Sequence, residues 1–255
     1  RLTDKRKHIL ANVHKKDRAT VEFLLLPLAT KVDITKLHHK PKSKTTALQG
    51  LIDEYVPLTY GESSNDSIAG MTANPQNELA LFANILAETA GASQVEADEL
   101  RQQLPYDIKS KILEAYVADV ASGQQFGGAL KTVNYNCRLR LNFAELLELK
   151  RLAPNSSIEV ASVTPRFGYQ LPKNLRQYES LVEPYFDSAL DSYTVLSNTP
   201  AAELLVLVGN TLDAYVIFDA KTALSFAHIK GSQTVDAIKK QLIELHPIVF
   251  TNIFE

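Results

Sequence analysis

The sequence contains one cysteine, one methionine and no tryptophan among its 255 residues. The single cysteine, Cys137, excludes an internal disulfide and a cysteine-rich metal site. Because Cys137 lies on the apolar face of an alternating segment, we interpret it as a buried structural thiol rather than a nucleophile. No apolar run approaches the roughly 18 residues of a membrane-spanning helix, so no membrane partner is expected. These features are compatible with a reducing setting, and we predict a cytoplasmic protein.

Several patterns that would indicate catalysis or ligand binding are also missing. His38 and His39 have no carboxylate or cysteine at ligand spacing, which favours a solvated loop, and no metal site is predicted. Gly127 and Gly128 precede a predicted strand, whereas a phosphate-binding glycine loop follows a strand and opens a helix. No Ser-His-Asp or Cys-His arrangement can be proposed from spacing, so no catalytic residue is assigned.

Charge is unevenly distributed along the chain. Residues 1–50 hold twelve Lys and Arg against four Asp and Glu, a balance of +8, and the remaining residues hold fifteen against twenty-five, a balance of −10, which together give −2. The basic end could bind phosphate or nucleic acid, although nucleic acid is the less favoured partner. Complementary surfaces in a homo-oligomer, or with a neighbouring domain, explain the asymmetry at least as well.

A strand–helix–strand–loop pattern between residues 133 and 172 is the most informative part of the sequence. Residues 133–141 alternate apolar and polar, with Arg138 and Arg140 on the polar face, which is typical of a half-buried strand. Asn142 then predicts a helix cap, which Glu145 completes as a capping box. A second strand is predicted over 158–163, followed by an ordered loop over 164–172.

The rest of the chain predicts mainly helices. They are expected over 7–28, 45–55, 75–89, 94–104, 106–121, 175–196, 201–208, 219–228 and 234–245, with further strands over 29–34 and 213–218. Residues 61–74, rich in Gly, Ser, Asn and Asp, are predicted to be a linker between residues 1–60 and 75–255. The expected fold class is α+β: a small mixed or antiparallel sheet covered by helices, with a helical lobe at 75–122.

Two distant stretches of the sequence are similar to each other, and we call this similarity the internal echo. Residues 25–33, LLPLATKVD, parallel residues 205–213, LVLVGNTLD, and a Lys-Thr-Thr-Ala-Leu or Lys-Thr-Ala-Leu run follows each, at Lys44 and at Lys221. By itself such an echo is weak evidence, because helix–strand–helix units are common.

The pattern resembles the core of the flavin-dependent thymidylate synthases, in particular their tandem, double-length members. That family has Y-x-F-x-x-x-x-x-F-G-A-Y-R-D-L-Q-R-H-R, followed about fifteen residues later by G-Y-x-x-P. Here Tyr135 aligns with the first Y of that pattern, and Phe143-Ala144 align with its F-G. Residues 147–151 align with R-D-L-Q-R. The G-Y-x-x-P motif is matched by Gly168, Tyr169 and Pro172. The resemblance makes residues 20–56 similar to the tail of a first unit and 76–252 to a nearly whole second unit.

The departures from the family pattern concern its arginines, which are suited to phosphate because the guanidinium makes bidentate contacts. Leu147 replaces an arginine, and Leu152 and Ala153 replace the family's H-R, which binds flavin. The family's R-x-x-R-R-x-x-P-G-R-A segment aligns with residues 119–129, where every arginine is replaced and Gly128 takes the last arginine position. In the segment 219–230 two arginines become Lys221 and Lys230.

The resemblance implies a degenerate, non-catalytic unit that supports an active half or a partner chain in the methylation of dUMP to dTMP. The partner would be a missing N-terminal catalytic unit or a second copy, joined through the central helix 142–151. An active FAD-dependent enzyme with sites completed across an oligomer interface, and a phosphate- or nucleic-acid-binding module using residues 1–50, remain alternatives. If the protein is active, FAD is the expected cofactor. Retained candidates for cofactor binding are Lys150, Arg151, Arg138 and Arg140, and for nucleotide binding Lys221, Lys230 and Tyr169.

Overall fold

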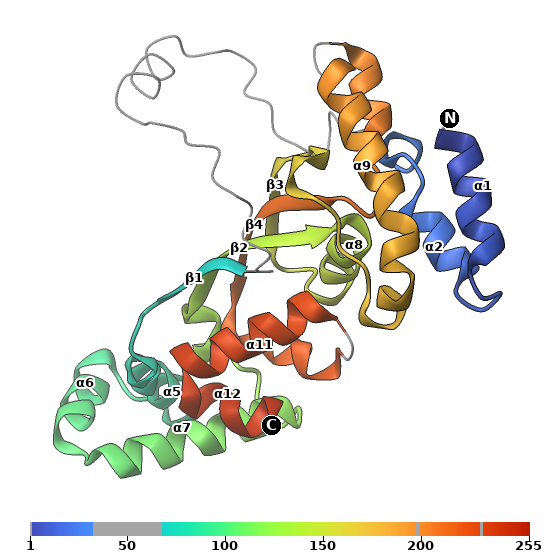
Figure 1. Ribbon diagram of the computed structural model, residues 1–255. Coiled ribbons are helices and arrows are strands. Elements are labelled where there is room, and N and C mark those ends of the chain that lie inside the picture. The colour runs from blue at the N-terminus through green and yellow to red at the C-terminus, as the bar shows by residue number, and fades with distance from the viewer. Residues whose placement is uncertain (1, 33–67, 197–198, 230–231) are drawn as a thin grey trace, which may run out of the picture. The chain divides into compact units, whose positions relative to one another are not determined.

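A computed structural model describes residues 2–32, 68–196, 199–229 and 232–255 (Figure 1). The helices are α1 Leu2–Asn12, α2 Arg18–Leu24, α5 Leu81–Ala90, α6 Gln94–Gln103, α7 Tyr106–Ala121, α8 Phe143–Leu152, α9 Glu179–Leu196, α10 Ala220–Leu224, α11 Gln233–Leu245 and α12 Pro247–Phe254. The strands are β1 Ile68–Asn74, β2 Asn134–Asn142, β3 Ser157–Ser162 and β4 Thr211–Asp219. The loop and helix predicted over 35–55, and Lys230, lie outside the described residues.

The chain forms two compact units, each built from two separate stretches. The first unit comprises residues 1–66 and 159–213, and the second comprises residues 67–158 and 214–255. Among the described residues, no helix has both the length and the apolar character needed to cross a membrane.

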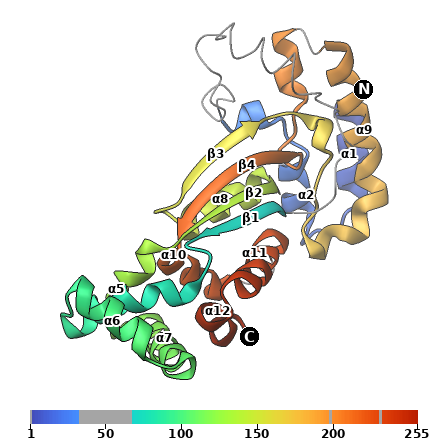
Figure 2. The same cartoon turned by 90° about the vertical axis from the view of Figure 1, so that its left-hand side faces the viewer.

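The strands belong to one sheet with the order β1-β2-β4-β3 (Figure 2). β1 and β2 are antiparallel, with Ala73 opposite Tyr135 and Asn74 opposite Asn134. Along β2 the side chains alternate between exposed and buried from Asn134 to Leu139, as the polar-apolar alternation predicts. The helices and this small sheet confirm the predicted α+β class.

β1 corrects part of the predicted linker, because residues 68–74 are a strand. The Gly, Ser, Asn and Asp content of residues 61–74 suggested a linker, but β2 supplies the pairing partners that keep residues 68–74 extended. The register slips between Ile68 and Gly70, where β1 has a bulge or similar irregularity. Residues 61–67 lie outside the described residues.

An aromatic cluster forms the centre of the second unit. Tyr135 of β2 stacks on Phe218 of β4 at 5.5 Å between ring centroids and meets Phe250 of α12 edge-on at 5.8 Å. Phe218 in turn packs edge-on against Phe226 at 5.2 Å. Such ring pairs contribute beyond the area they bury, so this cluster fixes how β2, β4 and α12 meet.

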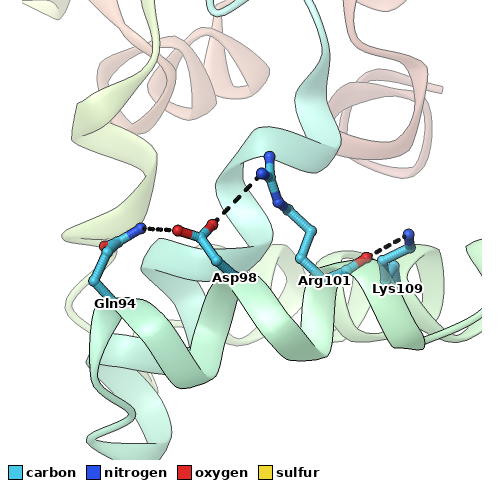
Figure 3. Close-up of polar contacts among 4 residues, drawn as sticks. All are labelled: Gln94, Asp98, Arg101 and Lys109. Carbon is cyan, nitrogen blue, oxygen red and sulfur yellow. Dashed lines mark hydrogen bonds and ion pairs between the residues drawn. The ribbon is translucent and has the colours of Figure 1, made fainter.

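The predicted helical lobe is formed by α5, α6 and α7. A capping box between Ser93 and Glu96 opens α6. On its surface Asp98 accepts a hydrogen bond from Gln94 at 3.2 Å and pairs with Arg101 at 3.5 Å, while Lys109 of α7 donates to the Arg101 carbonyl at 3.0 Å (Figure 3). The Lys109 contact satisfies a carbonyl at the carboxyl end of α6 and joins this helix to α7, whereas the two Asp98 contacts lie within α6.

The first unit corrects the helix predicted over 7–28, which is two helices separated by residues 13–17. The break brings Asp17 within reach of Tyr178, whose hydroxyl donates to the Asp17 carboxylate at 2.9 Å. The backbone N–H of His14 also donates to that hydroxyl, at 3.3 Å. In a continuous helix the His14 N–H would instead donate to a carbonyl of the preceding helical turn. The tertiary contact with Tyr178 therefore accounts for the break between α1 and α2.

Two further predictions in this unit are wrong for a related reason. The strand predicted at 29–34 begins instead as a 3-10 turn, Leu28–Thr30, and the helix predicted over 201–208 is a 3-10 turn, Pro200–Leu205, followed by extended backbone. Residues 26–28 and 206–208 pair with each other in antiparallel fashion about a bridge between Pro27 and Leu207.

This pairing joins the two stretches of the internal echo. Leu28 N–H donates to the Val206 carbonyl at 2.7 Å, and Val208 N–H donates to the Leu26 carbonyl at 2.9 Å. In the echo, residue 28 corresponds to 208 and residue 26 to 206, so exchanging the two stretches exchanges the two hydrogen bonds. The contact is locally twofold symmetric, a relation that the echo alone did not indicate.

Candidate functional site

The junction between β2 and α8 has the predicted capping box. Asn142 accepts a hydrogen bond from the Glu145 N–H at 3.0 Å, and the Glu145 carboxylate accepts from the Asn142 N–H at 3.3 Å. Asn142 is buried, and burial raises the pKa of Glu145 above its ordinary value. Both side chains of the capping box are therefore engaged in hydrogen bonds at the start of α8.

Replacing Asn142 with alanine is expected to destabilise the protein by about 1–2 kcal/mol, because the cap is removed in a buried place. Glu145→Ala should cost less, and the double variant should cost less than the sum, since the box is one reciprocal unit. Chemical denaturation measures all three. Full additivity, or no loss of stability for Asn142→Ala, would show that the box does not hold α8.

The positions that align with the family's flavin-binding residues lie on α8 and at its carboxyl end. Lys150 and Arg151 are exposed in its last turn, a favourable position against the helix dipole. Leu147 is 46% exposed, whereas Ala153, which ends the helix, is 1% exposed. Position 153 has no room for a long side chain, so a third cationic side chain cannot follow Lys150 and Arg151 there.

Arg138 and Arg140 lie on β2, before the first turn of α8. The Arg138 guanidinium lies 5.7 Å from the ring centroid of Tyr215 on β4. α8 is ten residues long and therefore spans about 15 Å. The structure thus places the β2 arginines and the Lys150–Arg151 pair at opposite ends of that helix, and they do not form one cluster.

The glycine loop before β2 is held by Glu88, which sequence reasoning missed. Its carboxylate accepts hydrogen bonds from the Tyr116 hydroxyl at 2.6 Å, from Gly128 N–H at 3.1 Å and from Ala129 N–H at 2.6 Å. Desolvation opposes the shift, but these hydrogen bonds lower the pKa of Glu88 below its ordinary value. Gly128, which aligns with a family arginine, is thus bound through its backbone to a carboxylate.

Lys221, in the first turn of α10, contacts the same loop. Its ammonium donates to the carbonyl of Phe126. Gly127 has φ 70°, and a Cβ there would lie 2.7 Å from a methyl of Val120, so only glycine fits. Lys221 and Glu88 therefore hold this loop between α7 and β2 in one conformation.

Tyr169 lies in the first unit, in acidic surroundings. Its ring stacks on Phe186 of α9 at 4.2 Å with an interplanar angle of 10°. Burial, followed by the charges of Glu183, Glu179 and Asp187, raises the pKa of Tyr169 to about 12. Carboxylates repel a phosphate, so these surroundings do not favour a nucleotide at Tyr169.

A second buried network missed by sequence reasoning lies in the core of the second unit. His246 Nδ1 is 2.6 Å from the Tyr135 hydroxyl, and Nε2 is 3.1 Å from the Gln76 carbonyl. A carbonyl only accepts, so Nε2 carries the proton and Nδ1 accepts from Tyr135. Nearby, Glu78 accepts from the N–H groups of Ile248 and Val249, each at 3.1 Å, at the start of α12. These contacts fasten α12 to β2 and to the segment after β1.

Across the described ranges, no group of three or more His, Cys, Asp or Glu side chains could hold a metal ion. The retained cations lie on β2, at the end of α8 and in α10. Ser225, one residue after α10, donates to the Leu152 carbonyl at the end of α8 at 3.2 Å.

Comparison with known proteins identifies a shared fold. No protein-family model matches the chain, and no curated protein sequence does. Among solved structures, the UMP/dUMP methylase PolB from Streptomyces cacaoi, bound with 5-Br dUMP, is similar with a TM-score of 0.51 and 13% identity, over 72% of this chain and 91% of the methylase. Thymidylate synthase X from Helicobacter pylori, with FAD and dUMP, is similar with a TM-score of 0.48 and 15% identity, over 74% of this chain and 98% of that protein. This chain shares the fold of the methylase.

Proposed function

We propose that this chain is a non-catalytic, structural unit related to the flavin-dependent thymidylate synthases, which supports an active unit or a partner chain in the methylation of dUMP to dTMP. The observation that supports this proposal most directly is the Glu88–Gly128 contact. At a position where the resemblance places an arginine, the backbone binds a carboxylate of the chain itself. A carboxylate there repels the phosphates of a flavin dinucleotide or a nucleotide.

The end of α8 gives independent support. At Ala153 the resemblance places an arginine, but the residue is buried and its N–H continues the helix to the Leu149 carbonyl at 2.8 Å. Lys150 and Arg151 remain exposed and are the residues through which an active enzyme would hold FAD. Two exposed cations without the missing arginines do not fit the phosphates of that cofactor.

Purified protein is expected to bind neither FAD nor dUMP at concentrations up to about 100 µM. A charge-assisted hydrogen bond from an arginine contributes about 1.5–3 kcal/mol, so the absence of arginine at positions 128, 147 and 153 lowers the affinity by several orders of magnitude. Calorimetric titration measures both ligands, with an active flavin-dependent thymidylate synthase as the positive control. Leu147→Arg is the matched variant, and it should restore little because positions 128 and 153 are unchanged. Low-micromolar binding of either ligand by the unmodified chain would favour the active enzyme instead.

A structural unit needs a partner, and we propose self-association or a partner chain at the outward side of α8. Leu147, Lys150 and Arg151 are exposed there, an apolar side chain beside two cations. The interface must also bury apolar surface, on the order of 1,000 Å² or more, because exposed ion pairs contribute little. Sedimentation at micromolar concentration should show a species heavier than the 28.2 kDa chain that Leu147→Asp dissociates. A single monomer at low and moderate salt would contradict self-association.

A further inference from the structure

The side of α9 that faces away from the core of the first unit carries a line of carboxylates. The buried side chains of α9 belong to the hydrophobic core of that unit. Four exposed acidic residues follow one another at intervals of four positions: Glu179, Glu183, Asp187 and Asp191. Residues at this spacing are neighbours on a helix, so the carboxylates form one line of about 18 Å along the helix axis. We call this line the acidic face of α9.

The fold does not require the acidic face. Like charges four residues apart on a helix repel each other, so the neighbouring carboxylates of this line destabilise α9. Within the described part of the chain, none of the four carboxylates forms an ion pair. Lys5 of α1, which donates to the Ser188 hydroxyl, brings one positive charge to α9. A larger cationic surface against α9 would replace the repulsion with attraction.

The same unit presents positive charge on the stretch that contains α1 and α2. Within residues 2–32 the exposed acidic residue is Asp4, and the exposed cations are Lys5, Lys7, Lys15, Lys16, Arg18 and Lys31. Asp17 is buried and bonded to Tyr178, and Glu22 is paired with Arg6 at 3.7 Å. The surface of this stretch is therefore net positive, opposite in sign to the acidic face of α9.

Lys15 and Lys16, which we call the lysine pair, lie in the break between α1 and α2. Tyr178 fixes this break through hydrogen bonds with its backbone and with the Asp17 carboxylate. Because Tyr178 directly precedes α9, the lysine pair lies near the amino end of that helix. Two further exposed cations shortly precede Tyr178: Lys173 and Arg176.

Within one copy of the chain, the lysine pair is too far away to neutralise most of the acidic face. Asp187 and Asp191 follow Tyr178 by nine and thirteen residues, which corresponds to about 14 and 20 Å along a helix. Exposed charges interact over roughly 8 Å at physiological ionic strength. The lysine pair and the far part of the acidic face are therefore both open to the opposite charges of a second copy.

The carboxyl end of α9 and the turn that packs on it also expose apolar side chains. Val195 is 83% exposed, and Leu204, in the 3-10 turn Pro200–Leu205, is 55% exposed. The outward half of this 18-residue helix, about 27 Å long and about 11 Å across, offers roughly 450 Å². A contact of that size belongs to the weak, transient complexes, which bury less than about 1,200 Å² in total.

We propose that the acidic face of α9 binds the lysine pair of a second copy of the chain, in a weak and salt-sensitive contact. The two surfaces differ, so the contact is heterologous, and each copy carries one surface of each kind. The uneven charge of the sequence is compatible with a homo-oligomer, and this proposal names the two surfaces that would meet. It does not depend on the proposed function, because it uses the first unit, whereas α8 and the glycine loop lie in the second.

The test is sedimentation velocity of the full chain at high micromolar concentration, at low and at moderate salt. All proteins carry Leu147→Asp, so that a contact at α8 does not contribute. Glu183→Gln with Asp187→Asn should weaken self-association about three- to thirtyfold, and so should Lys15→Gln with Lys16→Gln, because each removes two interface charges. Mixed in equal amounts, the two double variants should form a heterodimer, since an intact acidic face then meets an intact lysine pair.

The matched control is Glu99→Gln with Glu114→Gln, which removes two exposed carboxylates from α6 and α7 and changes the net charge equally. It should leave self-association unchanged. Chemical denaturation checks that each variant is folded. Removing the charges of Glu183 and Asp187 relieves repulsion along α9, so this variant should be at least as stable as the protein without it.

The proposal is overturned by a monomer at low salt, by equal weakening in the matched control, or by a mixture that gives no heterodimer. Replacing the four lysines within residues 36–44 tests another occupant. Self-association that occurs only after this replacement would show that the chain's own basic segment covers α9. Binding of polylysine by a chain that does not self-associate would identify a basic partner of another kind. Either result would equally overturn the second copy as the occupant.

Discussion

Replacing His246 with alanine is expected to destabilise the second unit by about 3–5 kcal/mol. The side chain is fully buried, and both ring nitrogens are bonded, to Tyr135 and to Gln76. Alanine would leave the Tyr135 hydroxyl without its acceptor in the core and would open a cavity between β2 and α12. Chemical denaturation of the full chain measures the change in the free energy of unfolding.

Two variants separate the hydrogen bond from the cavity. Tyr135→Phe removes only the hydroxyl and should cost about 1–3 kcal/mol, because Nδ1 is then buried without a donor. Combined with His246→Ala it should add less than its own cost, since the partner is already absent. A destabilisation below about 1 kcal/mol for His246→Ala, or full additivity in the pair, would show that the network does not hold α12.

The same histidine predicts how stability depends on pH. Burial lowers the pKa of His246 below its ordinary value, although hydrogen bonds to the carbonyls of Gln76 and Pro75 oppose the shift. In the unfolded chain the ring takes up a proton near pH 6.5, whereas in the folded chain it does so only at lower pH. The stability contribution is therefore complete above about pH 6.5 and is lost as the pH falls, at up to about 1.4 kcal/mol per pH unit.

Glu78 faces the same network and acts in the opposite direction. Burial raises the pKa of Glu78, against the hydrogen bonds from Ile248 and Val249 that lower it. Its protonation on acidification thus favours the folded state. The difference between the unmodified chain and His246→Asn, measured from pH 7 to pH 5, isolates the histidine. If both proteins lost stability equally over that range, His246 would not be the titrating group.

Asn210→Ala is expected to destabilise the first unit by about 2–4 kcal/mol. Asn210 is 2% exposed, and its side chain accepts from Leu207 N–H at 2.6 Å and donates to the Gly168 carbonyl at 3.0 Å. Its backbone forms an antiparallel bridge with Tyr169. Alanine would remove both side-chain bonds and leave the buried Leu207 N–H without this acceptor, whereas the Gly168 carbonyl keeps its bond from the Thr211 N–H at 3.0 Å. The free energy of unfolding is again the measurement.

Two neighbouring substitutions make this prediction specific. Gly209→Ala should cost about 1–3 kcal/mol by overpacking, because a Cβ there would lie 2.8 Å from the Phe186 ring and 3.1 Å from the Leu24 carbonyl oxygen. Asn174→Ala, at an exposed position of the same unit, should change stability by less than about 0.5 kcal/mol. Similar destabilisation at Asn174 and Asn210 would indicate a general effect on asparagine rather than the removal of these hydrogen bonds.

The sequence by itself determined the features that depend on near neighbours. The capping box at Asn142 and Glu145 spans three residues, the alternation in β2 repeats every second residue, and α7 has the predicted bounds, 106–121. These patterns are local, since capping and burial periodicity act over one helical turn or one strand. The α+β class follows from such elements in order, and the family resemblance rests on the same stretch.

Tertiary structure alone decided which distant groups meet. Tyr178 breaks the first predicted helix at Asp17 from 161 residues away, and Tyr135 meets His246 across 111 residues. Glu88 binds the glycine loop 40 residues further on, which is why the candidate cations there could not be judged from spacing. Periodicity records that a side chain is buried but not which partner satisfies it, because long-range pairing is selected by packing of the whole chain.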